Sequence, residues 1–499
     1  MKKLNKFFIA TFFLCAFTFS GKTWAQDIVW KKNFGGSSND AYNSVVAVTD
    51  GIVAVGYSWR KSFGNGDWVG VETKGDENGL GDAIIVKYDH DGNVVWEKNF
   101  GGRDTDEFRC VIEVSDGIVA VGNSSGRSFG SGDWEDVESQ EFGNAMIVKY
   151  DHAGNIVWKK NYDGGDVFCS VVTVSNGIVA VGSTRGFGFG GQANIVKYDN
   201  DGHVLWEKVL SKGWEEHIYL SVTAVSDGIV AVGNTYTDVS GYGRHDAVIV
   251  KYDTDGNVVW DKYFGGNDFD VFESVTTVSD GIIAVGYSRD KSFGNGDWED
   301  VMAISDYKDA IIVKYDHAGN VVWKKNFGEN NAYYSVEASA NSIVALGNTS
   351  LVKHDWTGNV LEKRDLSSGG SQDLTFVPDG IIAVGASPVS IPYTDEWTCF
   401  TGICSTDAII VKYEIFAVKT LATTPETGLR IYPNPTTGQL TIENGQLTIE
   451  KVEIFDVHGR LQKSETIKSK TDITIDISHF PAGFYFLRAD GKTAKIIKR

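Results

Sequence analysis

The chain is poor in proline, with 7 residues among 499, and in cysteine, with 5. It is also short of positive charge, because 46 lysines and arginines face 66 aspartates and glutamates, and the formal net charge is −20. Nucleic acid and anionic membranes would repel such a chain, so neither is expected as a partner. The sequence contains no HExxH motif and no phosphate-binding loop, which leaves two common enzyme classes without sequence support.

Long apolar runs are also missing, apart from one at the start of the chain. Three lysines precede an apolar core from Phe7 to Phe19, and a small-residue cleavage site ends at Ala25. The core is too short for a spanning helix, and no later stretch reaches that length. Residues 1–25 are therefore predicted to be a signal peptide, and the mature chain is expected outside the cytoplasm without a transmembrane segment.

Glycine is abundant, with 57 residues, and much of it recurs in a repeat. The segment DAIIVKYDHDGNVVWEKNFGG, residues 82–102, predicts two strands around a tight turn, because Gly92 and Asn93 tolerate a positive φ. Related segments begin at Asn144, Ala193, Asp246, Asp309, Ser350 and Asp407. Another hairpin, such as residues 44–56, precedes each of them. Self-similarity of this kind indicates a repeat fold.

One full unit has four antiparallel strands, called A to D. Strands A, B and C are apolar on both faces, so each sheet must be covered on both sides. Sheets stacked face to face around an axis meet this demand, which predicts an all-β, seven-bladed β-propeller. The seventh unit lacks strand D, and residues 28–34 match the missing strand. We expect this N-terminal strand to complete the last blade and close the ring.

The repeat segments WEKNFGG, DGIVAVGYS and DAIIVKYDHDGNVVW resemble the SBBP β-propeller repeat family over residues 26–413. The resemblance implies a seven-bladed propeller and does not imply a reaction. Cys110 and Cys169 stand one residue out of register in neighbouring repeats, so we expect them to be buried free thiols. Cys399 and Cys404 share the loop CFTGIC, and we expect a local disulfide between them in an oxidising compartment.

The repeats stop near residue 413, and residues 414–428 are predicted to be a linker. Residues 429–499 alternate short strands, as in a small β-sandwich-like domain. The segments IYPNPTTGQLTIE, VEIFDVHGR, ISHFPAGFYFLRAD and KIIKR closely resemble the type A C-terminal sorting domain of the type IX secretion system, apart from the tandem QLTIENGQLTIE. The resemblance implies contact with that machinery and export across a Gram-negative outer membrane. It also implies that the cargo ends anchored at the cell surface or released.

Two kinds of loop lie at opposite ends of a blade. The A–B and C–D turns are short here, whereas the B–C loops and D–A connections on the other face are long and varied, as binding loops often are. We call the face that carries the B–C loops and the D–A connections the B–C face. Three of its loops share the motif Phe-Gly-x-Gly-Asp-Trp, whose rings and carboxylates could contact a sugar or peptide. Alternatively, the rings cover the blade and the aspartate caps a turn. The candidate residues are Phe63, Asp67, Trp68, Phe129, Asp133, Trp134, Phe293, Asp297 and Trp298.

A second candidate set comprises four aspartates, each placed four residues before the same position of strand A. These are Asp40, Asp106, Asp166 and Asp270. They are expected near the mouth of the central channel, where clustered carboxylates could hold Ca²⁺. Alternatively, each caps its own D–A turn.

These features favour an exported, non-catalytic binding or scaffold module for an extracellular protein or glycan. The alternative is an extracellular glycan-active hydrolase or lyase that uses the channel-mouth carboxylates. A hydrolase needs two carboxylates at a defined separation and usually a basic partner. The sequence offers acids without a consistent companion, which favours binding. No cofactor other than Ca²⁺ is suggested.

Overall fold

The structure of the protein is a computed structural model. It describes residues 28–498 except 76–79, 139–142, 163–166, 185–190, 211–215, 238–243, 329–330, 340–341, 348, 367–369, 389–405, 415–429, 433, 435, 444–448, 457–460, 470–472, 482 and 490–491. The predicted signal peptide, the Cys399–Cys404 disulfide and Asp166 lie outside the described residues, as does nearly all of the predicted linker. No helix within the described part of the chain is long and apolar enough to cross a membrane.

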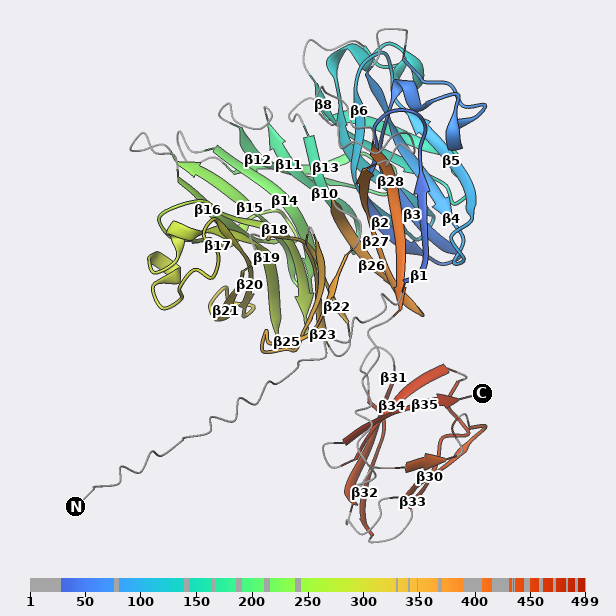
Figure 1. Ribbon diagram of the computed structural model, residues 1–499, viewed down its shortest axis with the longest axis vertical. Helices are drawn as coiled ribbons and strands as arrows, with labels where there is room; N and C mark the ends of the chain where they lie inside the picture. The colour runs from blue at the N-terminus through green and yellow to red at the C-terminus, as the bar shows by residue number, and fades with distance from the viewer. Residues whose placement is uncertain are drawn as a thin grey trace, which may run out of the picture.

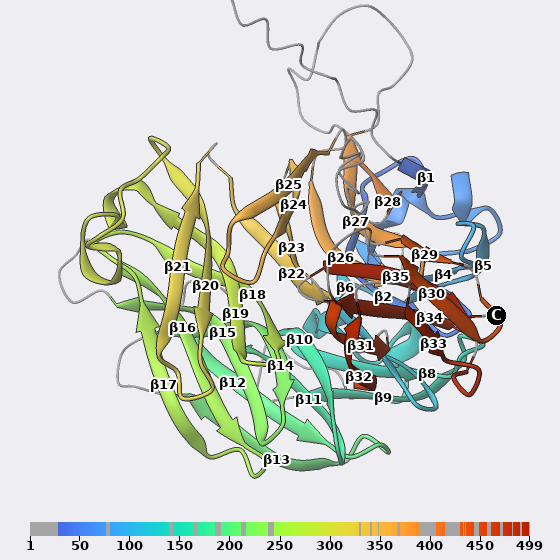
Figure 2. The ribbon, with the colours of Figure 1, turned by 90° about the horizontal axis from the view of Figure 1, so that it is seen from below.

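Seven four-stranded antiparallel sheets surround a common axis, as the two views in Figures 1 and 2 show. The predicted seven-bladed β-propeller is therefore confirmed. The blades are, in strand order A to D: blade 1, β2 (Asp40–Val48), β3 (Gly51–Trp59), β4 (Gly81–Tyr88) and β5 (Val94–Phe100); blade 2, β6 (Asp106–Val114), β7 (Gly117–Ser124), β8 (Asn144–Tyr150) and β9 (Ile156–Tyr162); blade 3, β10 (Val167–Val174), β11 (Gly177–Thr184), β12 (Gln192–Tyr198) and β13 (Val204–Leu210); blade 4, β14 (Glu216–Val225), β15 (Gly228–Thr237), β16 (Arg244–Asp253) and β17 (Val258–Phe264); blade 5, β18 (Asp270–Val278), β19 (Gly281–Arg289), β20 (Lys308–Tyr315) and β21 (Val321–Phe327); blade 6, β22 (Tyr333–Ser339), β23 (Ser342–Gly347), β24 (Ser350–His354) and β25 (Val360–Asp365); blade 7, β26 (Ser371–Val377), β27 (Gly380–Pro388), β28 (Thr406–Glu414) and β1 (Ile28–Phe34).

The ends of the propeller meet in blade 7. Strand β1 pairs antiparallel with β28, with Lys31 opposite Val411 and Phe34 opposite Ala408. Phe34 is 2% exposed, so the strand contributes to the core as well as to the ladder. The predicted closure by the N-terminal strand is confirmed, and it covers a sheet edge that would otherwise be open.

Burial explains why the repeated sequence forms this architecture. Every residue of the third strand in blade 1, GDAIIVKY, is buried, because neighbouring blades cover both of its faces. The fourth strand, VVWEKNF, is largely exposed or half-buried, as expected for the outer strand of a blade. The charged side chains of its lysine and glutamate also disfavour pairing of this edge strand with another sheet.

The tryptophan of strand D joins six of the seven blades to the next blade, and blade 6 has Glu362 at this position. In blade 1 the indole Nε1 of Trp96 donates a hydrogen bond to the carbonyl of His152, in the C–D turn of blade 2, at 3.3 Å. A Cβ on Gly154 of that turn would lie 3.0 Å from the Trp96 ring, so only glycine permits this approach. The same link occurs from Trp30 to His90, Trp158 to Asn200, Trp206 to Thr254, Trp260 to His317 and Trp323 to Trp356.

A belt of side-chain acceptors also links the innermost strands. Ser44 Oγ accepts from Val111 N of the next blade at 3.3 Å, and serines of blades 3, 4 and 5 repeat this bond. Asp373 occupies the position in blade 7 and accepts from Ser335 Oγ at 2.7 Å and Ser44 Oγ at 2.9 Å. Cys110 holds the position in blade 2. Cys110 and Cys169 are free, as predicted, although they are half-buried rather than fully buried.

The C-terminal residues form two further sheets. One contains β29 (Arg430–Tyr432), β30 (Gln439–Glu443) and β33 (Ile473–Asp476), and the other contains β32 (Leu461–Ser469), β31 (Ile449–Asp456), β34 (Gly483–Ala489) and β35 (Lys492–Lys498). Leu440 and Ile475 of the first sheet share one buried cluster with Ile454 and Leu487 of the second. The predicted small β domain is confirmed, with its two sheets packed over one core.

Candidate functional site: the B–C face

The three Phe-Gly-x-Gly-Asp-Trp loops fold back onto their blades. Each contains a short 3₁₀ turn that ends in the tryptophan: η2 (Gly66–Trp68), η4 (Gly132–Trp134) and η6 (Gly296–Trp298). All three tryptophans are 0% exposed. In blade 2, Trp134 Nε1 donates to Ser124 Oγ at 2.9 Å, and the indole meets Phe100 edge to face at 5.0 Å. The expectation that these rings could offer a face to a ligand is therefore not met, because each is enclosed in apolar core.

The phenylalanines complete this packing. Phe129 lies 5.1 Å from Trp134, centroid to centroid, and is 3% exposed, while Phe293 is 7% exposed and Phe63 is half-buried. Gly130 precedes the 3₁₀ turn and Gly132 begins it, with φ of 77° and 56°, a region that L side chains avoid. The two glycines are therefore explained by the positive φ angles that the loop requires, without any need for flexibility.

The motif aspartates fasten the loop to the D–A connection. Asp133 N donates to Gly101 O at 2.8 Å, and Asp133 Oδ2 accepts from Gly101 N at 3.1 Å. Asp67 pairs in the same two ways with Gly35, and Asp297 does so with Gly265. Each carboxylate therefore caps a turn, which is the alternative that the sequence left open.

The channel-mouth aspartates are likewise internal. Asp106 is 0% exposed, and its Oδ2 accepts from Gly102 N and Ser128 Oγ, both at 2.9 Å. Asp40 and Asp270 make the corresponding bonds. Burial raises the pKa of Asp106 to about 7 and that of Asp40 and Asp270 to about 6. Hydrogen bonds from serine hydroxyls and glycine N–H groups oppose this shift.

These aspartates do not assemble a shared site among the described residues. Each is buried in its own blade, and none belongs to a group of described acids whose oxygens lie close enough to share a metal ion; their expected place near the channel mouth stays a prediction. Within the described chain, the one group of acids and histidine whose ligand atoms lie within 4.8 Å of one another is Asp199, Asp201 and His203. It forms the C–D turn of blade 3, where Asp199 Oδ1 accepts from the N–H groups of Asp201 and His203. That turn is a hairpin cap.

The B–C face instead carries a cationic and aromatic cluster between blades 4 and 5, which sequence analysis missed. His245 stacks on Phe269 with ring centroids 4.2 Å apart and planes at 22°. The Arg289 guanidinium carbon lies 4.0 Å from the Phe269 centroid and 5.5 Å from that of Tyr307. Tyr307 is 53% exposed. We call His245, Phe269, Arg289 and Tyr307 the stacked cluster.

The stacked cluster comes from positions where the repeat is broken. Phe269 precedes the buried Asp270, at the place that Asn39 and Thr105 occupy in blades 1 and 2. Arg289 ends strand B, where blade 1 has Trp59 and blade 2 has Ser125. A search for departures from the repeat would have found these residues. A search for recurring motifs selects against them.

Comparisons with known proteins agree with the two-part architecture. Residues 430–499 match the family described as secretion system C-terminal sorting domain. Residues 81–262 and 143–297 match the family of the outer membrane protein assembly factor BamB. The chain therefore combines a BamB-like β-propeller repeat region with a secretion-system sorting domain, which implies export. The SBBP assignment stays a prediction.

Several solved propellers resemble the chain weakly. BamB from Moraxella catarrhalis is 10% identical, with a TM-score of 0.40 over 77% of this chain and 99% of that one. The Pan2 WD40 domain of Neurospora crassa is 9% identical, with a TM-score of 0.44 over 75% and 89%. A virginiamycin B lyase from Staphylococcus aureus is 11% identical, with a TM-score of 0.41 over 77% and 99%. No curated protein sequence matches the chain. These likenesses carry no functional argument.

Proposed function

We propose that the protein is an exported, non-catalytic binding module of the SBBP-like propeller type, secreted or held at the outer-membrane surface. Its ligand surface is the B–C face, and the stacked cluster is the contact. The sorting domain supports delivery to this location. The ligand class that suits the cluster is an acidic glycan.

The single observation that carries the proposal is the stacked cluster itself. The Arg289 guanidinium is held over the Phe269 ring, and its Nη1 lies 3.9 Å from Asp268; its other in-plane N–H donors can pair with a carboxylate or sulfate of a ligand. The exposed ring of Tyr307 beside it can pack against the C–H face of a sugar. In a chain with a net charge of −20, such a positive group also gives local attraction to an anionic ligand.

The buried aspartates support binding over catalysis. A glycan-active enzyme needs an acid and a second carboxylate that both reach the glycosidic bond. Asp40, Asp106 and Asp270 have no exposed surface, and each uses an oxygen to hold a turn of its own blade. The recurring acids of this face therefore serve the fold.

An array of neutral and acidic glycans, probed with the mature chain, tests the proposal. We expect retention on acidic glycans and loss of it in Arg289→Gln, which keeps the length of the side chain but removes its charge. Arg127→Gln is the matched control. Arg127 lies on the same face, is 80% exposed and pairs with Asp104 at 2.9 Å. The Arg127→Gln variant loses the same charge at a position outside the stacked cluster, so it should bind acidic glycans normally.

Three results would contradict the proposal. Equal retention of the Arg289→Gln and Arg127→Gln variants on acidic glycans would show that the stacked cluster does not contact the ligand. Absence of retention on every acidic glycan of the array would overturn the ligand class. Release of shortened glycan from the array by the mature chain would show an enzyme instead of a binding module.

A further inference from the structure

Among the described residues, a buried lysine of strand C forms an ion pair with an aspartate of the A–B turn in five blades. Lys87 Nζ lies 2.7 Å from Asp50 in the A–B turn of the same blade, and the lysine side chain is 3% exposed. The equivalent pairs are Lys149–Asp116, Lys251–Asp227, Lys314–Asp280 and Lys412–Asp379, at 2.7–2.8 Å. The aspartate supplies a counter-charge to an ammonium that the blades enclose.

Blade 3 breaks this pattern. Its A–B turn carries Asn176 in place of aspartate, so Lys197 has lost its repeat partner. Lys197 is 9% exposed, and its one hydrogen bond to a described residue runs from Nζ to Thr254 O at 3.4 Å. Across the part of the chain that the structure describes, Lys197 has no carboxylate in ion-pair distance. An enclosed ammonium with a single long bond to a neutral acceptor is costly unless an anion comes to it.

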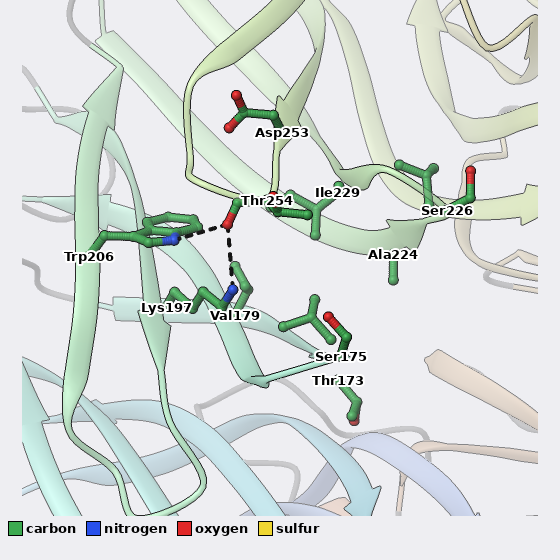
Figure 3. A pocket seen from close by; sticks show the side chains of 13 residues that line it. Thr173, Ser175, Val179, Lys197, Trp206, Ala224, Ser226, Ile229, Asp253 and Thr254 are labelled. Carbon is green, nitrogen blue, oxygen red and sulfur yellow. Dashed lines mark hydrogen bonds between the residues drawn. The ribbon is translucent and has the colours of Figure 1, made fainter.

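A cavity of roughly 200 Å³ lies beside this lysine, between blades 3 and 4. Its lining includes Lys197 and the apolar side chains of Val179, Trp206, Val225 and Ile229, and Figure 3 shows the lysine next to the indole. The exposed Ser175 and Ser226 belong to turns at its mouth, so a solute can enter from the face opposite the B–C face.

The one carboxylate that lines this cavity is engaged elsewhere. Asp253 Oδ1 accepts from the N–H groups of Asp255 and Asn257, and its Oδ2 accepts from Asn257 Nδ2. In Figure 3 its carboxylate lies well away from the Lys197 ammonium. Trp206 is also fixed, because its Nε1 donates to Thr254 O at 3.3 Å. The cavity thus combines a preset ring face, aliphatic walls and an available positive charge.

The geometry points to a binding site for a small organic carboxylate with an apolar group. Its carboxylate takes the place that aspartate fills in the other blades and pairs with Lys197. Its apolar group lies against Trp206 and Ile229. This site is separate from the stacked cluster, and neither depends on the other.

Calorimetric titration of the mature chain with benzoate tests the inference, with acetate and inorganic phosphate as comparisons. We expect one benzoate site, with acetate and phosphate both weaker because neither has a group that fills the apolar part. Asn176→Asp inserts the residue that five blades carry, so it should fold and bring an internal carboxylate to Lys197. A charged hydrogen bond is worth more than about 1.4 kcal/mol, so benzoate affinity should fall by at least about ten-fold.

Two further variants complete the test. Lys197→Gln should also lose benzoate, whereas Lys149→Gln, at the equivalent position of blade 2, removes the same charge from a lysine that already has its aspartate and should leave benzoate affinity unchanged. Unchanged affinity in both Asn176→Asp and Lys197→Gln would overturn the site. Phosphate binding as tight as benzoate would overturn the ligand class.

Discussion

Truncation of Trp68 should destabilise the propeller strongly, whereas truncation of a nearby exposed tryptophan should not. Trp68 is 0% exposed, donates to Ser58 Oγ at 3.0 Å and meets Phe34 edge to face at 4.9 Å. Replacement of a packed aromatic side chain by alanine costs about 3–5 kcal/mol. Trp59 in the same blade is 44% exposed. Trp59→Ala should therefore cost less than about 1 kcal/mol.

The expected loss for Trp68→Ala can be divided among its causes. The indole hydrogen bond accounts for about 1 kcal/mol and the edge-to-face contact for about 0.5–1.5 kcal/mol, and the rest comes from burial and the cavity left behind. Trp68→Phe keeps most of the burial, so it should lose about 1–3 kcal/mol. Because a whole domain is stable by only about 5–15 kcal/mol, each single variant should still fold.

Urea unfolding of the mature chain, followed by circular dichroism, measures these differences without relying on tryptophan fluorescence. The acidic-glycan array measures binding by the same variants. A Trp68→Ala chain with nearly unchanged stability but no glycan binding would refute the packing argument. It would indicate that the loop motif contributes to binding. A destabilised chain that binds normally would agree with the structure.

Two other predictions concern closure and pH. Deletion of residues 26–36 should expose the edge of β28 and lower the melting temperature markedly, and an unchanged melting curve would contradict closure. Phe34→Ala should cause part of this loss because Phe34 is buried, whereas Val29→Ala, at an exposed position of β1, should cause almost none. For pH, the folded pKa of Asp106 is about 7 against an ordinary 3.8, so the folded state holds more protons between these values and stability falls as pH rises from about 4 to about 7. Asp106→Asn should flatten this slope in melting scans, and a wild-type melting temperature that rises over the same range would count against the assigned shift.

Much of the fold follows directly from the sequence, because its causes are local and repeated. The glycine turns, the apolar strands and the match of residues 28–34 to a missing strand predict the number of blades and their closure. The link from Trp96 to the next blade was not predicted. It joins a side chain to a backbone carbonyl 56 residues away, and nothing in the spacing of the repeat names the acceptor.

The candidate site was predicted less well, for a physical reason. The loop motif recurs in three blades because its tryptophan fills the same space in the core of each blade, so Trp68 and its counterparts are buried. The same holds for Asp106, whose acceptor oxygen holds a turn. The alternatives of packing and binding could not be separated from residue types alone, since each uses the same rings and carboxylates.

In a ring of near-identical blades, features specific to one blade distinguish it from the others. Most links between neighbouring blades recur around the ring, so a residue that keeps the repeat can be explained by the fold alone. Asn176 removes a carboxylate that five blades retain and leaves Lys197 enclosed without its partner. Arg289 introduces a guanidinium where blades 1 and 2 have Trp59 and Ser125. Asn176 does not improve the packing of its blade in an evident way, whereas Arg289 stacks on Phe269; in both blades a positive charge lies where an anion can reach it. The two positions lie on opposite faces of the propeller, so variants of one should leave binding at the other intact.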